Sequence, residues 1–278
     1  MIRGSVEIRP FDLARTFAMG RFGLYDPTAS VSPRRLRKAF ATASGPCVVE
    51  LEARDGGVGY AVDGGDEREV AADLEEALAT DDGLDAFAPD HPVLAKLHRS
   101  LPGLRLVRVP WRFDVALSTV LQQRVTVREA WQQWSRIAAR YGEKCGDLRV
   151  APSAERVAQL ETWRLEELGV DPKRARAAVA IARDFHRRGS LAWTDRARIR
   201  KHLHAIRGIG PWTTEMTLGF GWGDPDALPL ADVHLPHLVA WALAHESRGT
   251  DERMIELLEP MRGHRFRAVR LLLAGVRR

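Results

Sequence analysis

A glycine-rich turn followed by a single aspartate is the pattern in this chain with the clearest chemical meaning. Gly208 and Gly210 flank one apolar residue, Ile209, between two segments with helical character. Glycines there permit a tight hairpin whose backbone N–H groups turn outward, and such a hairpin can hold a phosphate. Asp232 follows at a distance that a second helix and a turn would fill. For the glycines alone, an ordinary helix C-cap and turn is an equally good interpretation.

The segments on both sides of this turn are predicted to be helices that favour an anion. Upstream, Thr194 is a candidate N-cap, and Ile199, Leu203 and Ile206 recur at helical spacing on one face. Downstream, a helix is expected to start near Thr213, with its N-terminal amides and dipole directed at the same anion. The other face of the upstream helix is expected to carry solvent-exposed basic residues suited to a DNA backbone, namely Arg196, Arg198, Arg200, Lys201 and Arg207.

The stretch after the predicted hairpin adds a family signature. Residues 219–225 are rich in glycine and proline, and Asp232 lies in the sequence Leu-Pro-Leu-Ala-Asp-Val-His at residues 228–234. Together with the hairpin, these features resemble the HhH-GPD superfamily of base-excision DNA glycosylases, in which a helix-hairpin-helix motif precedes a Gly/Pro-rich loop and a catalytic aspartate. The resemblance implies a hairpin at about residues 199–221, a catalytic loop at 222–236, and DNA contacts from Gly208, Ile209, Gly210 and Thr213.

The resemblance also implies a role for the aspartate. A damaged base is rotated out of the duplex at a cost of a few kcal/mol. An N-alkylated purine then carries positive charge, so its glycosidic bond is already weakened and one carboxylate suffices. Asp232 would stabilise the oxocarbenium-like sugar and orient or deprotonate the attacking water. Its local alternative is a helix N-cap, because a helix is predicted over residues 235–245, and the two roles are compatible.

A second segment, at residues 110–126, resembles the helix and loop that AlkA-type 3-methyladenine glycosylases place in the minor groove. Phe113, Leu117, Val120 and Leu121 form an apolar helical stripe that ends in polar residues. By the resemblance, residue 123, a glutamine, would contact the groove, and residue 124, an arginine, would occupy the position of the wedge. The wedge is usually apolar in that family, so an arginine would act by stacking and charge. A solvated helix end is the alternative for Gln123 and Arg124.

Resemblance to the same glycosylases implies a base pocket with a reduced aromatic wall. Trp212 matches one aromatic ring, whereas Met216 and Val233 stand where other rings are expected, so cation–π selection would be weaker. Glu215 could hydrogen-bond a purine edge or could be an exposed helical carboxylate. Trp111 could line the same cleft or belong to the core.

Two absences from the sequence narrow the enzyme class. Bifunctional members of the superfamily use a lysine at the position of Trp212, and no lysine follows Lys201, so a monofunctional enzyme that leaves an abasic site is expected. The two cysteines, Cys47 and Cys145, are too few for a disulfide framework or zinc site, and the branch with a C-terminal iron–sulfur cluster is set aside.

Charge is unevenly distributed along the 278 residues. The net charge is +5, with an acidic stretch between Asp66 and Asp85 and a basic C-terminal end that is expected to meet DNA. The basic end comprises Arg262, Arg265, Arg267, Arg270, Arg277 and Arg278. We expect double-stranded damaged DNA as the partner, no membrane, and a monomer in the cytoplasm, associated with the nucleoid in a bacterium.

No cofactor or catalytic metal is expected, apart from a structural monovalent cation that the resemblance allows at the hairpin in the DNA complex. His234 and His237 lie three residues apart, a spacing that could bind a metal on one helix face. No cysteine or further carboxylate clusters with them, so DNA contact or helix capping is the preferred interpretation.

The expected fold is α+β. Residues 1–85 are predicted to form a β-rich domain with an acidic linker helix, since Ile2, Val6 and Ile8 alternate, and strands at 47–52 and 59–62 flank a turn at 54–57. Residues 86–278 are predicted to form the helical HhH-GPD core, without internal repeats.

Two other functions remain open at the level of the sequence. One is a glycosylase for bulky, oxidised or deaminated bases, which would keep the mechanism and change the pocket. The other is a non-catalytic helix-hairpin-helix protein that binds DNA or senses damage, which the altered aromatic wall favours. Retention of Asp232 argues against the second, because a pure binder has no use for a desolvated carboxylate near phosphates.

Overall fold

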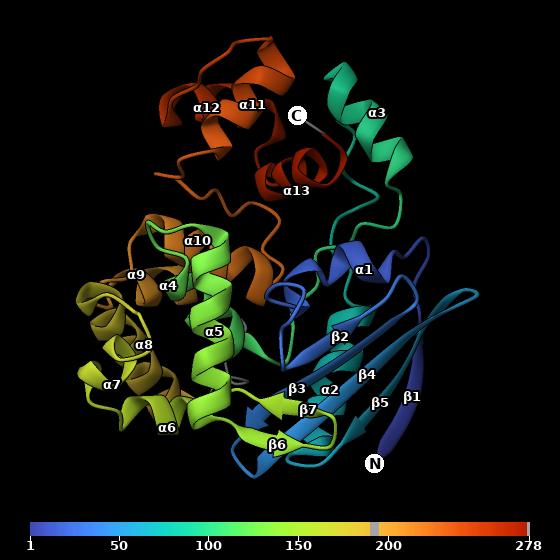
Figure 1. Cartoon of the computed structure of the whole chain (residues 1–278). Helices are drawn as coiled ribbons and strands as arrows, with labels where there is room; N and C mark the ends of the chain where they lie inside the picture. The colour runs from blue at the N-terminus through green and yellow to red at the C-terminus, as the bar shows by residue number, and fades with distance from the viewer. Residues whose placement is uncertain (190–194, 277–278) are drawn as a thin grey trace.

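A five-stranded antiparallel sheet forms the N-terminal part of the molecule (Figure 1). The computed structural model describes residues 1–189 and 195–276. Exposure alternates along the first strand, as the sequence predicts for a sheet with one face packed. In sheet order, the strands are β1 (Ile2–Glu7), β5 (Gly57–Asp63), β4 (Gly45–Arg54), β3 (Arg35–Thr42) and β2 (Ala29–Val31).

One face of this sheet is covered by short N-terminal helices and by the acidic helix. These are α1 (Leu13–Thr16), the 3-10 helix η1 (Ala18–Gly20) and α2 (Glu67–Ala79). Leu51, Val62 and Leu74 are among the buried residues that join strands and helix in one core. The turn predicted at 54–57 is present between β4 and β5, where Gly56 adopts a φ of +99° that favours glycine.

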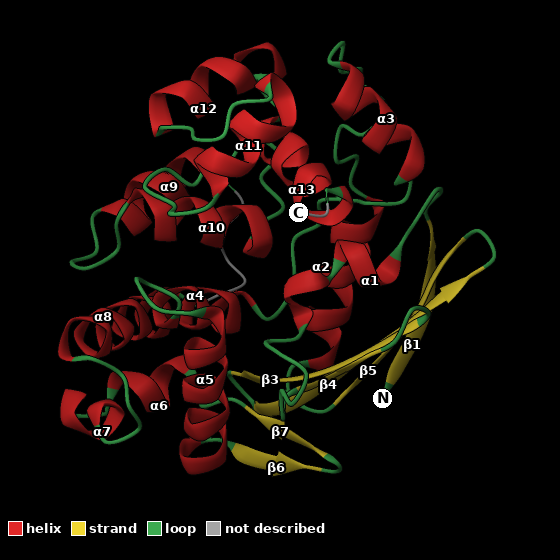
Figure 2. Cartoon of the chain, turned by 45° about the horizontal axis from the view of Figure 1, so that its top comes forward, coloured by secondary structure: helices red, strands yellow, loops and turns green. Residues whose placement is uncertain are grey.

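The helical part of the chain has two cores, one of which includes α4, α8 and α10 and the other α3, α11 and α13 (Figure 2). We call the first group of helices the lower lobe. It comprises α4 (Arg112–Leu121), α5 (Val127–Tyr141), α6 (Ala154–Ala158), α7 (Thr162–Glu166), α8 (Pro172–Arg188), α9 (Arg196–His204) and α10 (Pro211–Gly221).

The second group, the upper lobe, joins one early helix to the C-terminal helices. It comprises α3 (Pro92–Ser100), α11 (Leu235–Ala244), α12 (Asp251–Leu258), the 3-10 helix η2 (Glu259–Met261) and α13 (Arg265–Gly275). Leu94 of α3 packs in the same core as Val239, Met254 and Leu272. The loop at residues 222–234 runs between the two lobes and carries Asp232.

The predicted apolar stripe on α4 proves to be part of a helix buried on every side. Ser118 and Thr119 are buried as fully as Leu117, and both hydroxyls donate to the carbonyl oxygen of Val115. Asp114 forms a buried salt bridge of 2.9 Å with Lys38 of β3. Burial raises the pKa of Asp114, and Lys38 opposes that shift. The helix is therefore sandwiched between the N-terminal sheet and the lower lobe.

A small hairpin within the second half of the chain was not predicted. Strands β6 (Glu143–Cys145) and β7 (Leu148–Val150) pair with each other, and Leu148 and Val150 pack on Ala39 of the N-terminal sheet. Each strand has only three residues, too few to show alternation. No helix in the described part of the chain combines the length and apolar character that crossing a membrane requires.

Candidate functional site

The hairpin joins α9 to α10 through a turn that packs closely on α8. Gly208 has a φ of +89°, and a Cβ placed on it would lie 2.9 Å from the Cβ of Ala177. Both the positive φ and the lack of room for a Cβ therefore require glycine at position 208. The side chain of Ile209 is buried in the lower lobe, so only its backbone is available to a ligand. Asp195 is the N-cap of α9, and the predicted cap, Thr194, lies outside the described residues.

Gly210 is the N-cap of α10 and differs from Gly208 in its surroundings. Its backbone is extended, and a Cβ placed on it would have no described atom within 4 Å. With no side chain at the N-cap, no side-chain oxygen accepts from the first amides of α10. Those amides carry the positive end of the helix dipole. This end of α10 has the chemistry of an anion site that the backbone of a ligand can approach closely.

The loop after α4 is docked onto the hairpin by Gln123. Its amide nitrogen donates to the carbonyl oxygen of Gly208 at 3.0 Å and to the hydroxyl of Thr213 at 2.8 Å. Thr213 is buried, and its side chain joins the loop after α4 to the hairpin. Only its backbone amide is among the groups at the N-terminal end of α10 that an anion could approach. The neighbouring Arg124 is exposed and has a φ of +56°, a conformation unusual for a residue other than glycine. Of the two residues predicted to contact the groove, Gln123 therefore fixes the loop to the hairpin, and Arg124 is exposed to solvent.

Asp232 is held by three donors. One carboxylate oxygen accepts from the amides of His234 and Leu235 at 2.7 and 2.8 Å, and the other accepts from the indole nitrogen of Trp212 at 2.7 Å. The N-cap of α11 is His234 rather than Asp232, and the Asp232 carboxylate instead accepts from the amides of His234 and Leu235 just before and at the start of the helix. The preceding Ala231 has a φ of +62°, and its amide donates to Asp251 of α12. Contacts from both lobes fix this carboxylate.

Glu215 forms ion pairs and hydrogen bonds within the protein, which contradicts the prediction of an exposed helical carboxylate. Its side chain is 14% exposed and makes a bidentate salt bridge with Arg200 of α9, at 2.7 and 3.1 Å. It also accepts from the amide of Leu228, and Arg200 reaches Asp224 at 2.5 Å. Burial would lower the pKa of Arg200, but Glu215 and Asp224 raise it above its ordinary value. Arg200 was predicted to face DNA, and instead it ties α9 and α10 to the loop.

The other predicted pocket residues are distributed unevenly. Trp212 and Met216 are half-buried on α10, whereas Val233 is 73% exposed beside Asp232. Trp111 is 2% exposed and lies in the core of the N-terminal sheet, with its ring 5.8 Å from that of Phe17. The prediction that Trp111 lines the base pocket is therefore wrong. Its apolar ring fills the gap between sheet and α4, where nothing in its sequence context distinguishes it from a pocket tryptophan.

Two of the six arginines predicted to form a basic C-terminal surface are buried. Arg267 is buried against Asp82, and Arg270 is buried one turn further along α13, where it donates to the carbonyl oxygen of Arg15. Arg265 pairs with Asp226 at 2.6 Å, and Arg262 pairs with Glu259. The remaining two, Arg277 and Arg278, lie outside the described residues. The described arginines of α13 pair within the protein, so these three side chains do not form the exposed basic surface that was expected.

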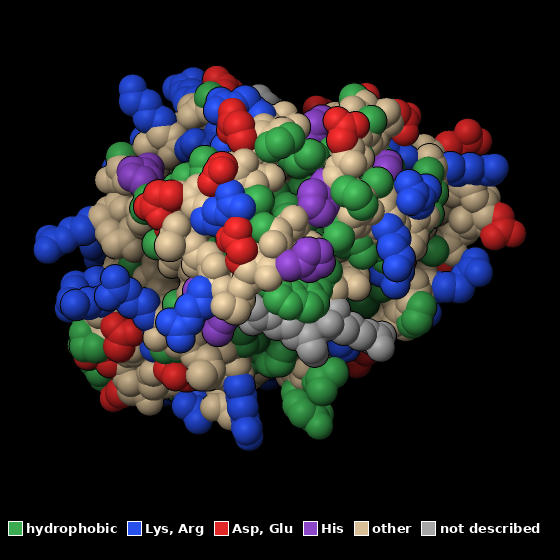
Figure 3. Space-filling model, turned by 90° about the horizontal axis from the view of Figure 1, so that it is seen from above, with side chains coloured by type: hydrophobic (Ala, Val, Ile, Leu, Met, Phe, Trp, Pro, Cys, Tyr) green, Lys and Arg blue, Asp and Glu red, His purple; other side chains and the backbone are tan. Residues whose placement is uncertain are grey.

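Exposed positive charge is found beside the hairpin, as predicted for the upstream helix. Arg196, Arg198, Lys201 and Arg207 are exposed on or after α9. Seen from above, Lys and Arg side chains project along the left-hand side, where α9 lies in Figure 1, and hydrophobic and histidine side chains occupy much of the centre (Figure 3).

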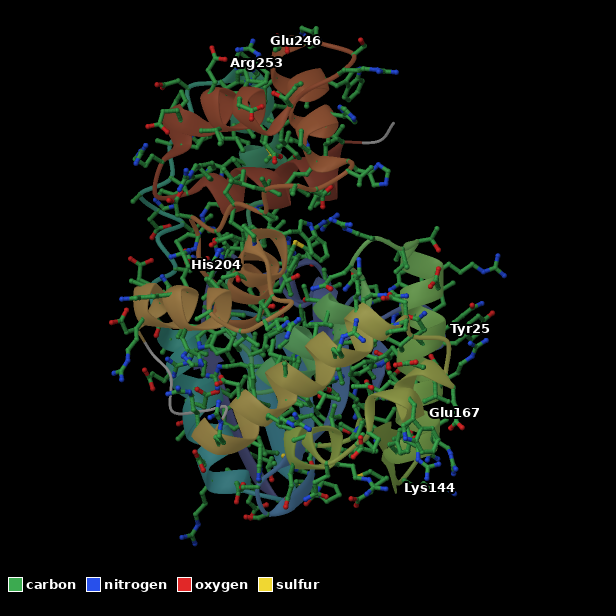
Figure 4. The ribbon with its side chains drawn as sticks, turned by 90° about the vertical axis from the view of Figure 1, so that its left-hand side faces the viewer. Tyr25, Lys144, Glu167, His204, Glu246 and Arg253 are labelled. Carbon is green, nitrogen blue, oxygen red and sulfur yellow. The ribbon has the colours of Figure 1, made fainter. Side chains whose placement is uncertain are left out.

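The histidine pair and the tip of the upper lobe have structural roles. Nδ1 of His237 accepts a hydrogen bond from the amide of Gly249 at 3.0 Å, which ties the loop after α11 to this helix. Among the described residues, no group of three or more His, Cys, Asp or Glu side chains could hold a metal ion. Arg253 and Glu246, hydrogen-bonded at 2.6 Å, lie together at the tip of the upper lobe, well away from His204 at the hairpin (Figure 4).

Comparison with known families agrees with this geometry. The model of the HhH-GPD superfamily base excision DNA repair protein matches residues 117–262, more than half of the chain. These residues include the second half of α4, the hairpin, the loop and Asp232. The chain belongs to the HhH-GPD superfamily, and its fold is the α+β arrangement of an antiparallel sheet followed by a helical core.

Individual relatives resemble parts of the chain. A probable bifunctional transcriptional activator/DNA repair enzyme AlkA of Mycobacterium tuberculosis is 32% identical over 52% of this chain, and the DNA-3-methyladenine glycosylase 2 of Escherichia coli is 32% identical over 48%. The matched part spans only 30% of the first relative and 49% of the second. A DNA-3-methyladenine glycosylase of Bacillus subtilis is 26% identical over 69% of this chain.

Solved structures share the whole fold at low sequence identity. A 3-methyladenine DNA-glycosylase from Archaeoglobus fulgidus superposes with a TM-score of 0.76 at 18% identity, over 98% of both chains. An 8-oxoguanine glycosylase/lyase from Clostridium acetobutylicum gives 0.70 at 16% identity, over 99% of both chains. The N-terminal sheet is therefore part of a shared architecture.

Proposed function

We propose that this chain is a monofunctional DNA glycosylase of base-excision repair that flips a damaged base out of duplex DNA and hydrolyses its N-glycosidic bond. Membership of the superfamily supports this proposal, and the names of its relatives support N-alkylated purines as substrates. The observation that carries it is the placement of Asp232 between the indole of Trp212 and the first amides of α11, beside an anion-binding helix end.

The hairpin and the loop after α4 would hold the DNA. The first amides of α10 and the open space at Gly210 suit a phosphate of the backbone. Exposed cations around α9 supply the nonspecific attraction, which weakens as salt rises. Arg124 projects from a loop that Gln123 anchors to the same hairpin, so the tip can fill the space left by a flipped base. Double-stranded DNA is therefore the proposed partner of a monomeric protein in the cytoplasm.

The hydrolytic step would use the carboxylate without a covalent intermediate. As the base leaves with the bonding electrons, positive charge develops on the sugar, and Asp232 stabilises that charge electrostatically. Water then attacks the sugar carbon, and the carboxylate orients it and accepts its proton. Trp212 occupies the place of the amine that bifunctional members use, so no Schiff base forms and the product is an abasic site.

We also propose that a monovalent cation binds at the hairpin in the DNA complex and that catalysis needs no metal. Carbonyl oxygens suit such a cation, and a hairpin offers several. The carbonyl oxygens of Ile206 and Gly208 each accept one hydrogen bond, from Ile209 and Gln123, and each retains a second lone pair. The hairpin therefore fits the role of a cation site.

Base release from methylated duplex DNA tests the proposal. The wild type should release methylated purines, detected by chromatography, and Asp232→Asn should lower the rate about a hundredfold or more while DNA affinity is retained. Asp55→Asn, at a fully exposed position of the β4–β5 turn, is the matched control and should behave as the wild type.

The outcomes separate the functional classes. No release by the wild type from methylated DNA, or from DNA with oxidised, deaminated or bulky bases, would contradict the glycosylase proposal. Retained tight binding would then identify a non-catalytic DNA-binding protein. Release of only the neutral lesions would keep the mechanism and exclude alkylated purines as substrates.

A further inference from the structure

Ala231, the residue before Asp232, has a backbone conformation that alanine rarely adopts. Its φ is +62°, in the left-handed region that favours glycine. An asparagine or aspartate can stabilise this conformation through its own side chain, but a methyl group cannot. Backbone outliers of this kind persist where the surrounding structure holds them, and they cluster at functional sites. A group outside residue 231 must therefore hold this conformation.

Asp251 of α12 supplies that support. Its Oδ2 accepts a hydrogen bond from the amide of Ala231 at 2.7 Å, across 20 residues of sequence. This amide belongs to the peptide plane from which the φ of Ala231 is measured, so fixing the plane limits rotation about the next N–Cα bond. Such a rotation would displace the Asp232 carboxylate from the indole nitrogen of Trp212, which donates to it at 2.7 Å.

Capping of α12 does not account for the Asp251 carboxylate. Thr250 is the N-cap of this helix, and its hydroxyl already accepts from the amide of Arg253 at 3.2 Å. The second oxygen of Asp251, Oδ1, is buried and accepts no hydrogen bond from any described residue. A buried acceptor without a donor lowers stability. The position of this carboxylate is therefore explained by the amide of Ala231 rather than by the helix.

Helix α12 is a firm base for such support because it packs on α11. Leu235 of α11 shares a buried core with Met254 and Leu258 of α12, and the two helices lie together in the upper lobe (Figure 1). The amide of Leu235 also donates to Asp232 at 2.8 Å. The residue before the carboxylate and the carboxylate itself are thus held by two helices of one core.

We propose that Asp251 is a positioning residue for base release. It holds Ala231 in the left-handed conformation that directs the carboxylate of Asp232 at the sugar of a flipped nucleotide. The inference rests on the proposed glycosylase function, and Asp251 acts through Asp232. Displacing a reacting group by about 1 Å can lower a rate about a hundredfold, so loss of this support should affect the chemical step more than DNA binding.

Single-turnover base release and a binding titration, both with methylated duplex DNA, separate these two quantities. Asp251→Ala should lower the single-turnover rate at least about tenfold, with a change in DNA affinity of less than about twofold. Asp251→Asn should keep the rate within about threefold of the wild type, since its amide oxygen can accept from the same N–H. Glu252→Ala removes the neighbouring exposed carboxylate in the first turn of α12, and this matched control should behave as the wild type.

A glycine at position 231 gives an independent test. Glycine adopts a positive φ without the steric cost that alanine has, so Ala231→Gly should make the support from Asp251 largely unnecessary. In the Ala231→Gly background, Asp251→Ala should therefore lower the rate less than about threefold. An equal loss in both backgrounds would overturn the proposal, because a general loss of packing at α12 would affect alanine and glycine alike.

The outcomes separate this inference from the proposed function. If the wild type releases no base, the proposed function fails. If the wild type releases bases and Asp251→Ala does so at the same rate, or if Asp251→Asn is as slow as Asp251→Ala, the positioning role is overturned while the function stands.

Thermal unfolding shows whether each variant is folded. If Asp251→Ala is not folded, Asp251→Ser takes its place, because serine suits the start of a helix and its hydroxyl lies one bond short of the carboxylate oxygen that Ala231 contacts. The same loss of rate is expected for Asp251→Ser, and a wild-type rate would overturn the proposal.

Discussion

The hydrogen bond from Trp212 to Asp232 joins an aromatic side chain of the lower lobe to the carboxylate at the start of the upper lobe. A tryptophan in this position does two things at once, because its ring can stack on a base while its N–H orients the carboxylate. A phenylalanine keeps only the first property. The two contributions can therefore be separated by one substitution.

Trp212→Phe should lower the rate of base release about tenfold or more with little change in DNA affinity, since the carboxylate loses one of its three donors but keeps the helix amides. Single-turnover kinetics and a binding titration measure the two quantities. Trp163→Phe, on the exposed face of α7, serves as the control. An unchanged single-turnover rate would show that the indole N–H has no part in positioning Asp232.

In the hairpin between α9 and α10, the two glycines are constrained by different parts of the structure. Gly208 is required by the protein, because its φ is positive and Ala177 leaves no room for a Cβ. Gly210 has open space beside it, so the protein alone does not require it. The constraint at Gly210 is expected to come from a bound DNA backbone.

Gly208→Ala should lower the free energy of unfolding by about 1–3 kcal/mol, because it combines a disfavoured φ with a steric clash. Gly210→Ala should change stability by less than about 1 kcal/mol and weaken DNA binding about tenfold. Urea denaturation and fluorescence anisotropy with duplex DNA measure the pair. Equal losses of stability in both variants would contradict the assignment of Gly210 to the DNA.

The hairpin, the β4–β5 turn and the helix after Asp232 could be predicted because each depends on neighbours in the sequence. Glu215 and Arg200 could not be assigned, since their pairing depends on how α9 lies against α10 rather than on either helix alone. The buried charges on α13 were interpreted as a DNA surface for the same reason: Asp82, the partner of Arg267, lies 185 residues away in the sequence. The sequence shows how many charged residues a segment has, whereas the three-dimensional fold is needed to show which of them form ion pairs.

Across the whole molecule, Asp82 connects three regions of the chain. Its carboxylate is 5% exposed and accepts from Arg105, from the amide of Leu106 and from Arg267 of α13. Asp82 thereby connects three parts of the chain: the segment after α2, the residues just before α4, and the C-terminal helix α13. Removing the charge would leave two arginines partly unpaired in the interior.

Asp82→Asn should lower the free energy of unfolding by about 3–5 kcal/mol, as expected for breaking a buried ion pair. Burial acts to raise the pKa of Asp82, but Arg267, the amide of Leu106 and Arg105 hold it below the ordinary 3.8. A carboxylate with a lowered pKa contributes stability above its unfolded pKa and loses it as pH falls.

Urea titrations at a series of pH values check both statements. Because the pKa of Asp82 is lowered in the folded state, the free energy of unfolding of the wild type should fall as the pH drops below about 4. The fall should be smaller in Asp82→Asn. Asp55→Asn, whose carboxylate is fully exposed, should show the wild-type slope. A variant with the same acid slope as the wild type would exclude Asp82 as a source of the pH dependence.

Helix α3 covers residues 92–100, yet most of the buried residues in its core lie between residues 228 and 272. Until the last part of the chain leaves the ribosome, the apolar face of α3 has nothing from the upper lobe to pack against. Contacts of such long sequence separation form late and slowly. Asp232 lies just before α11 of that same lobe, so, under the proposed function, a chain still lacking the upper lobe would have the hairpin for DNA binding before it had the fixed carboxylate for base release.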